Sequence, residues 1–132
     1  MLDTSTVILL GRISDPTELP DESVISAITL AELSVGPHVA HDETERSARQ
    51  QHLQQAEADF DVLPFDADCA RAFGAVAAAL RASGRKPAAR AYDALIAASA
   101  IAHALPLYTC NAADFEGIPR LELRAVTHPD HL

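Results

Sequence analysis

Four acidic side chains occupy positions where a carboxylate has little value for packing. They are Asp3, Glu32, Asp93 and Asp114. Asp93 directly precedes the apolar stretch ALIAASAIA, and Asp114 follows the apolar run LPLY. Aspartate is a poor helix former, and an unpaired buried carboxylate is costly. Each acid therefore either caps a helix or turn on its own, or the four together hold a cation.

A shared site would favour a hard divalent ion. Several carboxylates at one place repel one another unless they are protonated or bound to cations. An all-oxygen ligand set suits Mg²⁺ or Mn²⁺ with retained water molecules, rather than zinc. Such an ion lowers the pKa of bound water and polarises a phosphoryl oxygen. The four acids thus indicate hydrolysis of a phosphodiester.

Neutral and basic neighbours accompany these acids. Ser5, Thr109 and Asn111 carry oxygens that could hold a carboxylate or a water molecule, although turn formation explains them equally well. Arg90 lies one turn before Asp93, where it could meet a substrate phosphate or form an ordinary i, i+3 ion pair with that acid.

Alternating apolar runs and helical patterns predict an α/β domain with a mainly parallel sheet. The predicted strands are residues 1–3, 24–28, 60–65, 105–110 and 121–126, and the predicted helices are 29–36, 42–58, 66–82 and 87–105. Asp66 is the predicted N-cap of the helix over 66–82. Pro87 suits the first turn of the helix over 87–105, and Pro106 is expected to end that helix. Parallel strands present ligands at their carboxyl ends, where the four acids would then meet.

Composition sets the bounds on function. The 132 residues fit a single domain, 1–132, and the net charge of −9 excludes a nucleic-acid binder that relies on a basic surface. Cys69 and Cys110 lack metal-site spacing, so we expect reduced thiols. We identify neither a signal peptide nor a membrane segment, and therefore expect a cytoplasmic protein with no membrane partner.

Other folds and metals fit less well. A phosphoacceptor receiver domain needs a lysine near the end of its last strand, but the only lysine is Lys86, and no glycine-rich phosphate loop occurs. The pairs His38/His41 and His128/His131 lie beside a Gly-Pro break and at the terminus, so solvent exposure is expected. His103 is expected to pair with the last carbonyls of its helix.

Four motifs carry a family resemblance. DTS at 3–5, AEL at 31–33, RAYDALIAASA at 90–100 and YTCNAADF at 108–115 resemble the PIN-domain ribonucleases, more narrowly the VapC-type toxins. VLPFD at 62–66 extends the likeness over nearly the whole chain. The resemblance implies a PIN-like three-layer domain whose five-stranded sheet has the order 3-2-1-4-5 and is flanked by helices.

The resemblance also implies an activity. It is that of a Mg²⁺- or Mn²⁺-dependent endoribonuclease toxin that acts on an RNA substrate, is neutralised by a VapB-type antitoxin and forms a homodimer. Asp3, Glu32, Asp93 and Asp114 match the family's acids, but many relatives carry an acid where Asn111 stands, so Asn111 and Asp114 both remain candidates for the fourth place. The alternative is a catalytically inert PIN-like module that binds RNA or protein.

Overall fold

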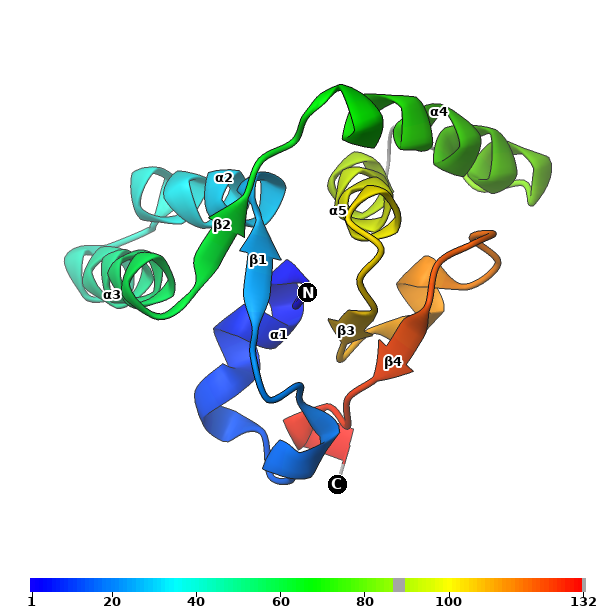
Figure 1. The fold of residues 1–132 in the computed structure, drawn as a ribbon. Coiled ribbons are helices and arrows are strands. Elements are labelled where there is room, and N and C mark those ends of the chain that lie inside the picture. The colour runs from blue at the N-terminus through cyan, green and yellow to red at the C-terminus, as the bar shows by residue number, and fades with distance from the viewer. Residues whose placement is uncertain (87–89, 132) are drawn as a thin grey trace.

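The computed structural model describes residues 1–86 and 90–131 and alternates strands with helices (Figure 1). The strands are β1 (Val24–Ser26), β2 (Asp61–Leu63), β3 (Leu107–Thr109) and β4 (Leu123–Ala125). The α-helices are α1 (Thr4–Leu9), α2 (Ala27–Val35), α3 (Glu43–Asp59), α4 (Ala67–Ala82) and α5 (Ala91–Ala102). Short 3₁₀ helices are η1 (Leu10–Arg12), η2 (Pro16–Glu18), η3 (Gly36–Val39), η5 (Ala112–Phe115) and η6 (Pro129–His131).

The strands form two parallel pairs, β1 with β2 and β3 with β4. Residues 1–3 contact both pairs. The Leu2 N–H donates to the Val24 carbonyl (3.0 Å), and the Tyr108 N–H donates to the Met1 carbonyl (2.8 Å). Within the described residues there are thus two small sheets rather than the predicted five-stranded sheet, because residues 1–3 are too few to form more than the isolated Leu2–Tyr108 bridge.

Side-chain caps determine where the helices begin. The Cys69 N–H donates to Asp66 (3.1 Å), so the predicted N-cap of α4 is confirmed. The Thr29 N–H donates to the Ser26 hydroxyl (3.1 Å), which ends β1 two residues before the predicted end of that strand.

Helix α5 buries Ala94 and residues 96–100 and lies against α4, which crosses it in Figure 1. It ends at Ala102, three residues before the predicted end. The Leu105 N–H donates to the Ala100 carbonyl and the Ala104 N–H to the Ile101 carbonyl, with Ala104 at a φ of 54°. This Schellman arrangement ends the helix before Pro106 is reached. The predicted position of Pro87 in the first turn lies outside the described residues.

Two apolar clusters fill the interior. One packs α4, α5, β3 and η5 together, and the other lies beneath α1, α2 and α3. Helix α3 is polar, as predicted, and Ala56 is its buried residue. None of the helices in residues 1–86 and 90–131 has the length and apolar character that crossing a bilayer requires.

The contacts of His103 differ from those predicted. Its Nε2 lies 3.2 Å from the Pro64 carbonyl and 3.7 Å from the Cys69 sulfur, so it links the end of α5 to α4 and to the segment before it, instead of pairing with helix carbonyls. Cys69 and Cys110 are both free thiols, as predicted, and Cys69 is buried.

Candidate active site

Asp3 is buried at the start of α1, and both of its carboxylate oxygens accept hydrogen bonds. Oδ1 accepts from the Thr6 N–H (3.0 Å) and the Thr6 hydroxyl (2.6 Å). Oδ2 accepts from the Thr109 hydroxyl (2.7 Å) and the Ser5 hydroxyl (2.9 Å). Asp3 is therefore an N-cap, but the cap also fixes one carboxylate in a single orientation at the carboxyl end of the residue 1–3 segment.

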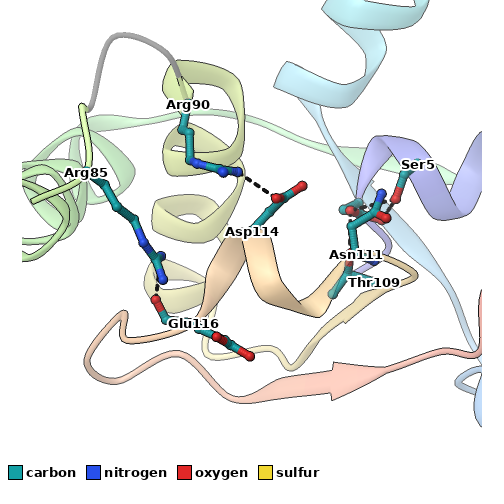
Figure 2. Close-up of polar contacts among 8 residues, drawn as sticks. Ser5, Arg85, Arg90, Thr109, Asn111, Asp114 and Glu116 are labelled. Atoms are coloured by element: carbon teal, nitrogen blue, oxygen red, sulfur yellow. Dashed lines mark hydrogen bonds and ion pairs between the residues drawn. The ribbon is translucent and has the colours of Figure 1, made fainter. Parts of the chain in front are cut away.

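Donors from β3 and α1 meet around this carboxylate, and Figure 2 shows two of them, Ser5 and Thr109, with Asn111 beside them. The Asn111 N–H donates to the Thr109 hydroxyl (2.9 Å), while the Asn111 side chain is exposed. Thr6 was not among the predicted site residues. Its hydroxyl also accepts from the Cys110 N–H (3.1 Å), and its position three residues after the N-cap was a signal available in the sequence.

Glu32 projects from α2 and is partly buried. The Thr4 hydroxyl donates to its Oε1 (2.7 Å) and lies 3.1 Å from the Thr29 hydroxyl. Burial raises the pKa of Glu32; the Thr4 hydrogen bond opposes that rise, and the negative charge of Asp3 adds to it. Glu32 therefore faces the same region as Asp3.

Asp93 lies in the first turn of α5 and has no hydrogen-bond or ion-pair partner among the residues that the structure describes. Burial raises its pKa to about 6, and the charges of Asp114, Asp3 and Glu32 add to the rise, while Arg90 opposes it. Asp93 is thus within electrostatic range of the other three predicted acids.

Asp114, in η5, forms an ion pair with the Arg90 side chain. Arg90 Nη1 donates to Asp114 Oδ1 (2.6 Å), and both side chains are partly exposed (Figure 2). The ion pair of Arg90 is thus with Asp114, not with Asp93 at i, i+3. Nearby, Arg85 Nη1 donates to the Glu116 carbonyl (2.6 Å).

The arrangement of the acidic side chains indicates how a metal ion could bind here. In the described ranges, no three histidine, cysteine or acidic side chains stand in an arrangement that would hold an ion by themselves. Mg²⁺ keeps several waters and is commonly bound through only one or two carboxylates. The fixed carboxylate of Asp3 and the partnerless, half-buried carboxylate of Asp93 fit that hydrated mode of binding.

Several known proteins resemble this chain in sequence. The family model for the PIN domain matches residues 1–121. Ribonuclease VapC5 of Mycobacterium tuberculosis is 39% identical over 111 residues, or 83% of this chain and 80% of that protein. Ribonuclease VapC of Rickettsia bellii is 31% identical over 133 residues, with 98% of each chain covered.

A solved structure resembles the chain in fold. The crystal structure of VapBC-5 from Mycobacterium tuberculosis, a member of the VapBC family of toxin-antitoxin systems, matches with a TM-score of 0.80 and 36% identity over 95% of this chain and 96% of that one. The chain therefore belongs to the PIN-domain family and, within it, to the VapC ribonucleases. The resemblance of the four motifs is confirmed.

Proposed function

We propose that this chain is a metal-dependent endoribonuclease toxin that hydrolyses RNA phosphodiesters and is neutralised by a VapB-type antitoxin. The observation that carries the proposal is Asp93. It is half-buried, lacks a partner among the described residues, and has its pKa raised to about 6 by burial and by the charges of the other three acids. A pocket of mutually repelling carboxylates is stabilised when a cation enters it.

Each acid then has a defined task. Asp3 and Asp93 hold Mg²⁺ or Mn²⁺, and Glu32 joins directly or through water. That ion, when bound, supplies a nucleophilic water near neutral pH and stabilises charge on the phosphate. Ser5 and Thr109 keep the Asp3 carboxylate in place through bonds of 2.9 and 2.7 Å.

The outer side of the site is formed by Asp114 or Asn111. When water attacks the phosphorus in line and the 3′-oxygen is the leaving group, the 2′-hydroxyl is not needed as a nucleophile, and the products carry a 5′-phosphate and a 3′-hydroxyl. Because Asp93 binds a proton tightly, protons compete with the metal ion, and we expect metal affinity to fall as the pH drops below about 6.

RNA cleavage under metal titration tests the proposal. The purified chain should cut single-stranded RNA in Mg²⁺ or Mn²⁺, stop in excess EDTA, and leave 5′-phosphate ends that ligation-based sequencing detects. Asp93→Asn should abolish cleavage, while Asp21→Asn, at an exposed position, is the matched control. A folded Asp93→Asn variant that cuts at the wild-type rate would refute the assignment, and RNA binding without any cleavage would indicate the inert module.

The antitoxin is proposed to bind through two features. An arginine can pair with the acidic site through a fork of hydrogen bonds. A hollow of about 560 Å³ between α1 and α3, with Val7, Ala56 and Phe60 in its lining, suits an amphipathic element. Charge reversal of the antitoxin's arginines should relieve inhibition in the cleavage assay; unchanged inhibition would rule out the arginine mechanism.

Two finer structural statements belong to the same proposal. We infer that the pairs join through residues 1–3 into the order β2, β1, residues 1–3, β3, β4, which is the predicted 3-2-1-4-5; the hydrogen bonds of Leu2 to Val24 and of Tyr108 to Met1 support it. We also infer a homodimer, because most residues of α3 are exposed and a second copy of the chain could cover them. Sedimentation velocity at several concentrations tests the dimer, which a monomer at all of them would exclude.

A further inference from the structure

A second, smaller pocket opens directly beside the acidic site. Its volume is about 240 Å³, and α1, α2 and α3 provide its walls. Its lining includes Thr4, Ile8, Glu32, Leu33, Arg49 and His52. Thr4 and Glu32, joined by their 2.7 Å hydrogen bond, belong to both the pocket and the acidic site, so an occupant of the pocket would lie next to the proposed reaction centre.

The lining combines an apolar floor with flat, nitrogen-bearing side chains. Ile8 and Leu33 provide aliphatic surface, whereas the His52 ring and the Arg49 guanidinium extend from neighbouring turns of α3. Unpaired RNA bases are commonly bound by stacking on histidine rings and arginine planes. The pocket therefore offers the surfaces that a nucleobase requires.

Arg49 is held in place rather than simply solvated. Its Nη1 donates to the Gly36 carbonyl (2.9 Å), and its guanidinium also pairs with Glu45. The side chain crosses Gly36 so closely that a Cβ built there would lie 3.3 Å from Arg49 Cδ. A wall residue fixed by two polar contacts loses less conformational freedom when a ligand stacks on it.

We propose that this pocket binds one base of the RNA substrate, the base adjacent to the cleaved phosphate. The inference rests on the proposed ribonuclease function and adds to it a site that selects the cleavage sequence. The volume supports this occupant, because pockets for drug-sized ligands measure roughly 300–1,000 Å³. At about 240 Å³ the pocket suits one planar ring system, whereas the neighbouring 560 Å³ hollow is the better fit for a helix.

The first test is the base preference of cleavage. A randomised single-stranded RNA pool is cut in Mn²⁺ by the full chain, and the 5′-phosphate ends are sequenced. The wild type should show a preference at one position that flanks the cut. His52→Ala should flatten it, and Ile8→Trp, which fills the pocket, should do the same.

Matched controls and a binding measurement accompany this test. Gln51→Ala and Val35→Trp change exposed residues of α3 and α2 that do not line the pocket, and should retain the preference. Short RNAs with 2-aminopurine at the flanking position are also titrated into proteins that carry Asp93→Asn, so that cleavage does not intervene. Loss of the His52 ring should weaken binding about fivefold to 150-fold and reduce the fluorescence quenching.

The possible outcomes separate the two proposals. If the wild type cuts RNA without any flanking preference, or if His52→Ala leaves the preference and the quenching unchanged, the base site is wrong. If the two pocket variants keep their RNA preference, the base site is again overturned, whether or not they lose affinity for the antitoxin, because Ile8 and His52 also line the 560 Å³ hollow. If the wild type cuts no RNA, the ribonuclease proposal fails, and the 2-aminopurine titration still decides whether the pocket binds a base.

Discussion

Arg90 and Asp114, 24 residues apart in the chain, meet through a 2.6 Å contact between Nη1 and Oδ1 on one side of the acidic site (Figure 2). The pair places a positive charge beside Asp93, whose pKa Arg90 lowers. The site thus contains a cation of its own, in addition to any that it binds.

The first prediction concerns this ion pair. Arg90→Gln removes the charge that lowers the pKa of Asp93 and leaves the repulsion from Asp114 uncompensated, so the pKa of Asp93 should rise above its value of about 6. The pH midpoint for Mn²⁺ binding, measured by calorimetry, should move upward with it. Arg85→Gln is the matched control, because Arg85 contacts the Glu116 carbonyl and no site carboxylate (Figure 2). Equal midpoints for all three proteins would contradict the prediction.

The second prediction is that an active-site substitution stabilises the metal-free protein. The folded state binds a proton at Asp93 more tightly than the unfolded chain does, since the pKa rises from 3.8 to about 6. The contribution of Asp93 to the free energy of unfolding is therefore fully present below about pH 4, and it is lost as the pH rises through about 6. At pH 7.5 in EDTA, Asp93→Asn should therefore unfold at a higher urea concentration than wild type. Its free energy of unfolding should be larger by about 1 kcal/mol, after allowance for the partial solvent exposure of Asp93.

The pH and the metal ion provide the controls for that measurement. The difference between Asp93→Asn and wild type should shrink at pH 4.5, where Asp93 is protonated, and saturating Mn²⁺ should reverse it at pH 7.5 because only the wild type gains metal binding energy. A variant less stable than wild type at pH 7.5 in EDTA would show that Asp93 is not under repulsion.

The third prediction concerns the support of Asp3. Thr109→Val removes a buried 2.7 Å hydrogen bond to Asp3 Oδ2 at nearly constant side-chain volume. We expect a loss of about 1–3 kcal/mol in unfolding free energy, because the buried oxygen loses a donor, together with weaker Mn²⁺ binding. Thr44→Val, on the exposed side of α3, is the control. An unchanged Mn²⁺ affinity would mean that Thr109 serves only the fold.

The fourth prediction concerns the thiols. Burial raises the pKa of both Cys69 and Cys110 above the usual value for cysteine. Because the thiolate is the reactive form, both should be alkylated by iodoacetamide at pH 7.5 more slowly than free glutathione, as mass spectrometry over time would show. Rapid labelling of Cys69 in the folded protein would place it outside the core.

Local signals in the sequence were enough for much of the fold. Asp66 begins α4 as predicted, because an aspartate before an amphipathic run is a strong N-cap that depends on few other residues. The end of α5 was predicted at Leu105 from Pro106, but Ala104 adopts a left-handed conformation, and the Schellman hydrogen bonds end the helix at Ala102. An alanine in that conformation gives no sequence signal, since glycine is the usual residue there.

The sequence by itself identified the candidate metal ligands, because acids at or just after the carboxyl ends of predicted parallel strands are expected to meet at one edge of the sheet. It also determined the family, since motifs spread from residue 3 to residue 115 keep their order and separation. Only the tertiary structure decided the partners of those residues. Arg90 was equally placed for Asp93 or for a phosphate, and it pairs with Asp114 because the fold brings η5 beside the start of α5. Spacing along one helix fixes which residues can meet within it, whereas contacts between segments 24 residues or more apart depend on how the helices and strands pack.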